Sequence, residues 1–406
     1  MVNIRDTHYD VIIVGAGMVG ATAACLAAQI ADKQGSSALK IGLIESRSAP
    51  PFDSNQFDPR VAALTEKTRS LLERCSVWED IQAKRVAPYR AIQVWDAEGT
   101  GQINFNCRDA HLPNLGHIVE ASAITSSLMT HVELLPNIDI YCPAVVNNYT
   151  AEEDSVILDL GTGARISANL LIAADGANSS VRQQFQFATR EWDYQQQAIV
   201  TTITTERPNQ QTAWQRFMST GPLALLPLND DGNLHRCSIV WSQDTEEAER
   251  LMALGDEDFC EQLSIASEHC LGQVTAVNKR FLIPLRQRHA IDYAKPRVAL
   301  IGDAAHSIHP LAGQGVNLGF ADVQVLVEEI KRAFSRGIDL GELSVLKRYQ
   351  RRRKPENLAA MATMEGFKRL FGSDNSALRL MRNRGMSGVD QIVPLKNQLI
   401  KKAMGL

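Results

Sequence analysis

The sequence predicts an α/β protein in which a helix-covered parallel sheet is combined with a second, mostly antiparallel sheet and a helical C-terminal segment. Three observations lead to this fold. The chain opens with a strand, a helix and a strand around a glycine-rich turn, its middle part alternates polar and apolar residues, and its last part is helical and basic. A chain of 406 residues is also long for one hydrophobic core, which favours more than one lobe.

The first binding signal is the turn Gly15-Ala-Gly17-Met18-Val-Gly20. It follows a buried strand (YDVIIV) and opens an alanine-rich helix, after which a second buried strand (KIGLIE) follows. Gly15 permits a tight turn, Gly17 allows a pyrophosphate to approach the backbone, and Gly20 allows helix and strand to pack closely. The start of the helix offers free N–H groups to phosphates. The unit therefore predicts a Rossmann-like fold that binds a dinucleotide, with Met18 among the contacts.

Glu45 closes the second strand, 25 residues beyond Gly20. A carboxylate at this place accepts hydrogen bonds from the adenosine ribose in dinucleotide-binding folds. The separation is slightly longer than usual, which a polar surface extension at residues 32–37 explains. The alternative is that Glu45 is only a solvated residue at the end of a strand.

At two later places in the chain, a predicted buried strand is followed directly by an aspartate and a glycine. The run LLIAA leads into Asp175-Gly176 and a helix start near Arg182, although an isolated Asp-Gly pair is also an ordinary turn signal. The run VALI leads into Gly302-Asp303, where the carboxylate is placed to hold a sugar or ribityl hydroxyl.

The last of these stretches continues through Pro310 to Gly313-Gln-Gly315-Val316-Asn317. Pro310 makes the turn rigid and removes a donor, whereas Gly313 and Gly315 allow the backbone to lie against a flat ring. A helix beginning near Gly315 aims free N–H groups at that ring. An isoalloxazine suits this place, because its N1–C2=O2 edge gains negative charge on reduction.

The middle of the chain, about residues 190–285, predicts the antiparallel sheet. The segments 198–205 (AIVTTITT) and 236–241 (RCSIVW) show the alternation and β-branched content of half-exposed strands. Trp192, Trp214 and Trp241 suit a wall for an apolar ligand, with packing in the core as the alternative.

The C-terminal part is helical and basic. Apolar residues spaced by three and four predict a helix over 316–334, and the chain after Lys354 predicts a helix to about Phe371 followed by irregular structure. Residues 343–406 hold fourteen Lys and Arg but four Asp and Glu, a charge of +10 in a chain whose net charge is −4. This asymmetry favours contact with an anionic membrane face or an acidic partner protein. No nucleic-acid motif accompanies it, so nucleic acid is not an expected partner.

Several classes of protein are excluded. Seven scattered cysteines without a Cys-x-x-Cys pair argue against a disulfide framework or zinc site and for a reducing compartment. His306 and His309 lack accompanying carboxylates or cysteines, so no metal is expected. No signal peptide or membrane-spanning run is expected, which predicts a cytoplasmic protein, with peripheral placement on the inner membrane face as a further expectation. Without a nucleophile elbow, triad or redox cysteine pair, the chemistry must come from a cofactor.

Together, the glycine turn and the Asp175-Gly176 and Gly302-Asp303 stretches resemble the para-hydroxybenzoate hydroxylase-like flavoprotein monooxygenases. The resemblance implies FAD, with Asp303 on the ribityl chain and the backbone of residues 313–317 facing the flavin ring. It also implies that Asp175-Gly176 serves both FAD and NAD(P)H. Arg60, in DPRVAAL, would lie near the flavin entrance, and Val145 would contact the adenine.

The run HPLAGQGVNLG (309–319), followed by Asp322, resembles the FAD-dependent hydroxylases of ubiquinone biosynthesis more narrowly. Within that family, the chain resembles the enzymes that hydroxylate a 2-polyprenylphenol such as 2-octaprenylphenol. The resemblance lies in the segments 116–120 (GHIVE), 192–195 (WDYQ), 237–242 (CSIVWS) and 403–406 (AMGL). One departure is Ala121, where those enzymes usually have asparagine.

This resemblance implies a monooxygenase that hydroxylates the ring of a polyprenylphenol with NAD(P)H and O2, through a C4a-hydroperoxyflavin. A sibling enzyme that acts on another ring carbon shares all these motifs and stays open. The alternative from another class is a non-catalytic flavin-containing subunit of a quinone-synthesis complex. The expected partners are the prenylated phenol, other ubiquinone-biosynthesis proteins and a second copy of the chain. No catalytic side chain is assigned.

The predicted domain organisation is discontinuous. The FAD-binding domain takes residues 1–87, 113–189 and 286–350, the substrate domain 88–112 and 190–285, and the basic helical segment 351–406.

Overall fold

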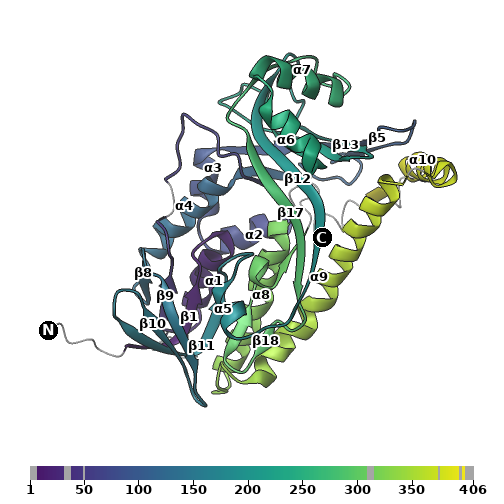
Figure 1. The fold of residues 1–406 in the computed structure, drawn as a ribbon. Coiled ribbons are helices and arrows are strands. Elements are labelled where there is room, and N and C mark those ends of the chain that lie inside the picture. Colours follow the sequence, from purple (N-terminus) through teal and green to yellow (C-terminus); the bar gives the residue numbers. More distant parts are fainter. Residues whose placement is uncertain are drawn as a thin grey trace.

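The computed structural model describes residues 7–31, 38–48, 51–308, 315–373, 375–392 and 396–397. These residues form sheets of eight, nine and three strands. Figure 1 shows the first sheet with its helices in the lower part of the molecule, the second sheet above it, and one long helix beside both. The predicted combination of a helix-covered parallel sheet with a mostly antiparallel sheet is confirmed.

The eight-stranded sheet is the core of the lower lobe. Its strands are β1 (Thr7–Val14), β2 (Ile41–Ile44), β8 (Ile138–Tyr141), β9 (Val146–Ala151), β10 (Val156–Leu160), β11 (Arg165–Ala173), β18 (Ala294–Lys295) and β19 (Val298–Leu300). The run β19-β11-β1-β2-β8 is parallel. Helices cover such strands on both faces, which requires apolar residues throughout, and all four residues of β2 are buried.

Helices and a small antiparallel sheet surround this core. They are α1 (Met18–Ala28), α2 (Glu66–Arg74), α3 (Trp78–Lys84), α4 (Ala121–Val132), α5 (Ser180–Gln184), α8 (Gly315–Phe334) and the three strands β3 (Val61–Leu64), β4 (Val86–Tyr89) and β7 (Gly116–Glu120). The predicted helix over 316–334 is confirmed as α8, whose apolar stripe is buried. The strand expected over 298–303 is shorter, because the chain turns into a single 3-10 turn at Gly302–Ala304.

The nine-stranded sheet forms the upper lobe. Its strands are β5 (Ala91–Asp96), β6 (Gln102–Asn106), β12 (Thr189–Thr205), β13 (Thr212–Met218), β14 (Gly221–Pro227), β15 (Arg236–Asp244), β16 (Val274–Val277), β17 (Phe281–Ala290) and β20 (His306–Ser307). Two helices, α6 (Thr245–Ala253) and α7 (Asp256–Ala266), cover one face. Trp214 and Trp241 pack into the core beneath them, with Trp241 edge-on to Phe259. These two tryptophans therefore belong to the core, although Trp214 also lines a pocket beside β5 and β6.

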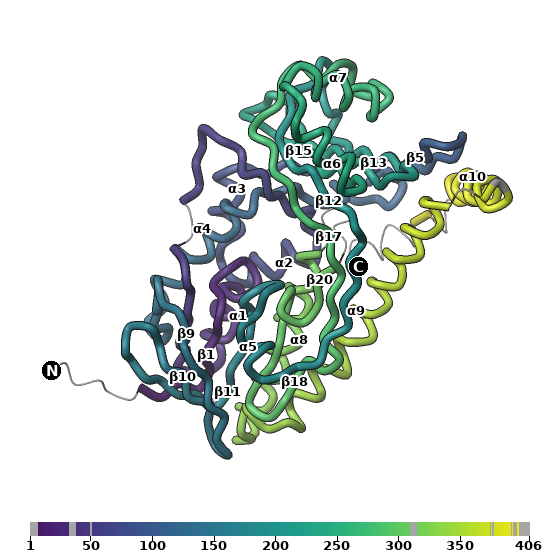
Figure 2. The backbone as a smooth tube through the Cα atoms, viewed as in Figure 1, coloured from purple at the N-terminus to yellow at the C-terminus, as the bar shows by residue number. Residues whose placement is uncertain are grey.

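The short strand β20 joins the two sheets. His306 and Ser307 pair with His289 and Arg288 of β17, only a few residues after β19 has left the parallel sheet. Figure 2 shows β20 beside β17 and next to α8. The chain therefore passes directly from one sheet into the other, and we call this crossing point the seam.

The C-terminal segment differs from the expectation. A single helix, α9 (Leu343–Phe371), begins before Lys354 and continues through Pro355, and α10 (Ser376–Gln391) follows where irregular structure was expected. Asn375 caps α10, because its side-chain oxygen accepts the N–H groups of Ala377 and Leu378. The expectation of irregular structure after Phe371 was wrong, because the Asn375 cap starts a new helix there.

The division into domains stays a prediction, and its boundary at 350–351 falls inside α9. Within the described ranges, no helix is both long and apolar enough to cross a membrane.

A buried ion pair fastens α10 to the upper sheet. Arg382 Nε lies 2.6 Å from Asp96 Oδ2 at the end of β5, and its Nη2 lies 2.9 Å from Oδ1. Both side chains are almost completely buried. Arg382 also donates to the carbonyl oxygens of Leu370 and Phe371, which satisfies the rest of its guanidinium.

We expect Arg382→Ala to lower the free energy of unfolding by about 3–5 kcal/mol, because Asp96 would remain buried without its counter-charge. Arg384 lies on the same helix but is exposed, and Arg384→Ala should change stability by less than about 0.5 kcal/mol. Urea unfolding of both variants measures the difference. Equal effects would contradict an anchoring role for the buried pair.

Candidate functional site

The glycine-rich turn between β1 and α1 has the backbone that its sequence predicts. Gly15 has a φ of 100°, and a Cβ there would lie 2.4 Å from the carbonyl oxygen of Ala174. A Cβ on Gly20 would lie 1.8 Å from the carbonyl oxygen of Gly15. Around Gly17, by contrast, no described atom apart from those of Gly17 and its chain neighbours lies within 4 Å of a Cβ position. Gly15 and Gly20 therefore build the turn, whereas Gly17 leaves free space in front of the helix.

The start of α1 is suited to an anion. Gly17 is its N-cap residue, and no described side chain caps the helix, which begins at the half-buried Met18. Helix N-termini without such a cap present N–H groups and a partial positive charge to phosphates.

Glu45 and Val145 lie at the same edge of the sheet. Glu45 Oε2 accepts the N–H of Ala16 at 2.7 Å, so the carboxylate lies against the glycine turn. The carbonyl oxygen of Glu45 accepts the N–H of Ala144, which brings the exposed Val145 close to it. The structure thus brings together the residues predicted to bind the ribose and the adenine.

The Asp175-Gly176 turn lies beside the glycine turn, because Val14 and Ala173 are paired at the ends of β1 and β11. Asp175 Oδ2 accepts the N–H groups of Ser180 and Val181 at 2.7 and 3.2 Å and so starts α5. Its other oxygen, Oδ1, is buried without a partner among the described residues. Asp175 therefore has a local structural role and still offers one acceptor to a ligand.

Arg182 connects this turn to the third motif, a role that sequence reasoning missed. Its buried guanidinium donates to the carbonyl oxygens of Ala177 at 2.6 Å and Ala304 at 3.0 Å. Burial lowers the pKa of Arg182, with Arg288 contributing. The only signal in the sequence is its place in a helix start after Asp-Gly.

The third motif meets α1 and α8 at Val19. A Cβ on Gly319 of α8 would lie 2.7 Å from Val19 Cγ2, and one on Gly302 would lie 3.3 Å from Val19 Cγ1. Asp303 follows at once and is solvent-exposed. The protein atoms around it nevertheless raise the pKa of its carboxyl by desolvation, while His306 opposes this. Asp303 therefore keeps an exposed carboxylate that a ligand can contact, although protein atoms surround it.

The start of α8 is fixed by Asn317. Its Nδ2 donates to the carbonyl oxygen of Ala63, and its Oδ1 accepts from Thr65 N–H and Thr68 Oγ1. The side chain of Asn317 thus joins α8 to β3 and α2, and its backbone is what remains for a ligand. Gly315 and Val316 form the first turn of α8, whereas Pro310 and Gly313 lie outside the described residues.

Arg60 lies on an exposed loop fastened to β7. Its side chain is 67% exposed and 3.8 Å from Asp58 Oδ1. The N–H of Asp58 donates to Glu120 Oε2 at 2.6 Å, and the N–H of Ala121 donates to the carbonyl oxygen of Arg60. Ala121, which stands where the related enzymes usually have asparagine, therefore contacts this loop through its backbone.

Glu120 and Arg85 hold this loop, and nothing in the sequence pattern indicates it. Arg85 Nε lies 2.9 Å from Glu120 Oε1. The same guanidinium lies over the rings of Phe52 and Phe57 and donates to the carbonyl oxygens of Asp53 and Gln56. Burial raises the pKa of Glu120 to about 7, although Asp58 N–H and Arg85 favour its charged form.

These features fit FAD. The open space at Gly17 and the uncapped helix suit the pyrophosphate, Glu45 and Val145 suit the adenosine, and the exposed carboxylate of Asp303 suits the ribityl chain. Among the described residues, no group of three or more His, Cys, Asp or Glu is arranged to hold a metal ion. Fold and site together define a two-lobed flavoprotein, while the role of each residue stays a prediction.

Comparison with known proteins identifies the family. Residues 8–363 match the FAD binding domain family, and the chain belongs to it. It is 35% identical to 3-demethoxyubiquinol 3-hydroxylase of Escherichia coli, an alignment that covers 98% of each chain. It is 34% identical to the mitochondrial ubiquinone biosynthesis monooxygenase COQ6 of Xenopus tropicalis, over 97% of this chain and 92% of the relative. The resemblance to the FAD-dependent hydroxylases of ubiquinone biosynthesis is confirmed.

Solved structures agree on the fold. The p-nitrophenol 4-monooxygenase PnpA of Pseudomonas putida superposes with a TM-score of 0.76 at 18% identity, covering 98% of both chains. PqsL of Pseudomonas aeruginosa gives 0.74 at 20% identity, over 94% of this chain and 100% of that one. The protein is an FAD-dependent aromatic-ring monooxygenase, a class that uses NAD(P)H and O2. Its partners and its place in the cell stay predictions.

Gly17 and Gly20 provide a matched pair of substitutions. Gly17→Ala meets no described atom and should fold with an unchanged apoprotein melting temperature, but its methyl group should weaken FAD binding by roughly 10-fold or more. Gly20→Ala collides with Gly15 and should destabilise the fold itself. Thermal melts and FAD titration of the apoproteins separate the two effects. Normal FAD affinity in Gly17→Ala would argue against the pyrophosphate at this turn.

The raised pKa of Glu120 predicts a pH dependence of stability. Its carboxyl has an ordinary pKa of 4.5 when unfolded and about 7 when folded, so the folded state binds the proton more tightly. The resulting stabilisation is complete below pH 4.5 and is lost as the pH rises through 7. Urea unfolding across this range should show a loss of up to about 3 kcal/mol from this group, which Glu120→Gln removes. Glu133→Gln replaces an exposed carboxylate and should leave the pH dependence of the free energy of unfolding unchanged.

Proposed function

We propose that this protein hydroxylates the aromatic ring of a polyprenylphenol in ubiquinone biosynthesis, with NAD(P)H as reductant and O2 as oxygen donor. The observation that carries the proposal is the seam. The turn with Asp303 continues within a few residues into β20, which is paired with β17 of the upper sheet. A flavin held by Asp303 would therefore lie next to that sheet, where a substrate bound on it is within reach.

A groove beside the seam supports a large amphipathic substrate. It has a volume of about 780 Å³ and lies between β12, β17 and α9. Trp192, Leu358 and Met361 contribute apolar surface, and His289, which is paired with His306 across the seam, lines the same groove. The volume is within the range of small-molecule sites. Of the three tryptophans predicted to form a ligand wall, Trp192 is the one that lines this groove.

Bound FAD supplies the oxygen-transfer chemistry, for which NAD(P)H gives the electrons and O2 the oxygen atom. The protein's own residues position the cofactor and shield the reaction from water. The start of α8 directs N–H groups toward the predicted flavin edge, where negative charge on reduction is stabilised. Asp303 would hold the cofactor chain, and the groove walls formed by β12, β17 and α9 would limit the access of water to the reacting atoms.

The relatives support ring hydroxylation in this pathway and also favour a second candidate. The Escherichia coli relative is named 3-demethoxyubiquinol 3-hydroxylase. A sibling reaction on that compound is therefore the alternative to hydroxylation of 2-polyprenylphenol.

The test is turnover by the purified holoenzyme with NADH or NADPH, isotopically labelled O2 and a short-chain 2-polyprenylphenol in detergent. We expect substrate-dependent consumption of NAD(P)H and a product carrying one labelled oxygen atom on the ring. Mass spectrometry of the product identifies the carbon that is hydroxylated.

A parallel reaction with 3-demethoxyubiquinol provides the comparison, and an anaerobic reaction provides the control. If only 3-demethoxyubiquinol gives product, the protein catalyses the sibling step and not the hydroxylation of 2-polyprenylphenol. If neither compound accelerates NAD(P)H oxidation or gains oxygen, the proposal fails in favour of a non-catalytic flavin-containing subunit.

A further inference from the structure

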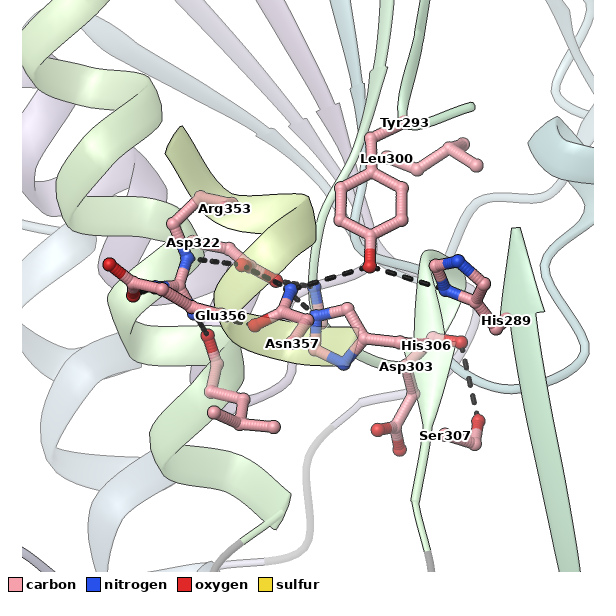
Figure 3. Close-up of polar contacts among 12 residues, drawn as sticks. His289, Tyr293, Leu300, Asp303, His306, Ser307, Asp322, Arg353, Glu356 and Asn357 are labelled. Atoms are coloured by element: carbon pink, nitrogen blue, oxygen red, sulfur yellow. Dashed lines mark hydrogen bonds and ion pairs between the residues drawn. The ribbon is translucent and has the colours of Figure 1, made fainter. Parts of the chain in front are cut away.

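A wholly buried carboxylate, Asp322 of α8, lies behind the turn that carries Asp303. Its Oδ2 accepts the N–H of Gly302 at 3.1 Å and lies 2.5 Å from His306 Nε2. Its Oδ1 accepts from Arg353 Nε at 2.8 Å and from Asn357 Nδ2 at 3.1 Å. Figure 3 shows Arg353, Asn357 and His306 around this carboxylate. Burying a charge requires such complete pairing.

The two oxygens of Asp322 face different parts of the chain. Oδ2 contacts residues on either side of Asp303, namely Gly302 and His306. Oδ1 contacts two residues of α9, one helical turn apart. Asp322 thus joins the turn of residues 302–306, which we call the cofactor turn, to the long C-terminal helix.

The contacts continue beyond the carboxylate into the upper sheet. Asn357 also accepts from Arg353 Nη2 at 2.6 Å and donates to the hydroxyl of Tyr293 at 3.5 Å. That hydroxyl lies 3.3 Å from His289 Nδ1 at the end of β17. The cofactor turn is therefore held by a connected buried network that reaches the groove, since His289 lines it.

The position of Asp303 indicates what the network is for. Asp303 lies between the two residues that Asp322 holds, and Figure 3 shows its own carboxylate turned away from the network. Nothing in the network uses the side chain of Asp303 apart from its electrostatic interaction with His306 and Asp322. The network therefore sets the direction of a carboxylate that is left free for a ligand.

The α8–α9 interface contains a second buried carboxylate without this connection. Glu329 is buried and pairs with Arg348 and Arg352 of α9 at 3.0 and 2.9 Å. It lies about two helical turns beyond Asp322, and its polar contacts among the described residues are with Arg348 and Arg352, not with the cofactor turn. If ion pairs between these helices served stability alone, Asp322 and Glu329 would be equivalent.

We propose that Asp322 is a positioning residue for the cofactor: it fixes the cofactor turn so that Asp303 is presented to FAD, and Arg353 and Asn357 of α9 hold Asp322 in place. The inference rests on the predicted role of Asp303 in the FAD site. Because it concerns affinity for FAD and not hydroxylation, its failure is distinguishable from failure of the proposed function.

The test compares Asp322→Asn with Glu329→Gln in the full-length chain. Both substitutions remove one buried negative charge from the α8–α9 interface at nearly constant volume. We expect Asp322→Asn to raise the dissociation constant of FAD from the apoprotein by roughly 10-fold or more and to change the near-UV and visible dichroism of bound flavin. Glu329→Gln should lower the melting temperature but leave FAD affinity within roughly twofold of the unmodified protein.

A milder variant keeps the test decisive if Asp322→Asn does not fold. Asn357→Ala removes one donor on the α9 side of the network and leaves Asp322 charged. We expect it to weaken FAD binding by roughly three- to tenfold. Unchanged FAD affinity in Asn357→Ala, or an equal loss in Glu329→Gln, would overturn the proposal and leave Asp322 as an ordinary stabilising ion pair.

Discussion

The close approach of α1 to the turn at Gly302 and to the start of α8 is the constraint on which the site depends. Val19 fills the space that side chains on Gly302 and Gly319 would need. This contact brings the N-terminal turn, the turn after β19 and the first turns of α8 to one point, although they are far apart in the sequence. Each contributes a different function there: free N–H groups, a carboxylate and a helix start. A larger residue at any of these glycines would separate them.

Beyond these close glycine contacts, buried arginines connect segments that are distant in the sequence. Arg182 joins the second turn to the third, Arg353 joins α9 to α8, and Arg382 joins α10 to β5. A guanidinium suits this role because its donors form a rigid fork that satisfies several acceptors at once. Each of these arginines is nearly wholly buried and makes at least two hydrogen bonds. The lobes are therefore connected by specific polar contacts as well as by apolar packing.

The local parts of this architecture could be predicted from the sequence. The turn of Gly15, Gly17 and Gly20, with flanking strands and helix, is specified by neighbouring residues, and the apolar spacing of residues 316–334 specifies α8. The linking residues could not be predicted, because their partners are distant. Arg182 follows a turn signal like any helix-start arginine, and the contact of Arg85 with Glu120 depends on how β4 and β7 pair. For Trp241 the sequence predicted a ligand-facing position that the structure does not show. The alternating pattern of its strand does not indicate which face of the sheet the helices cover.

The long helix α9 gives the molecule an order of assembly. Ribosomes deliver the glycine turn, the second turn and Asp303 before Arg353 and Asn357. Up to that moment Asp322 lacks half of its donors and carries a charge that folding alone cannot bury at low cost. A chain interrupted before α9 would therefore leave Asp322 with only the N–H of Gly302 and His306 as partners, a pairing too incomplete to bury its charge at low cost.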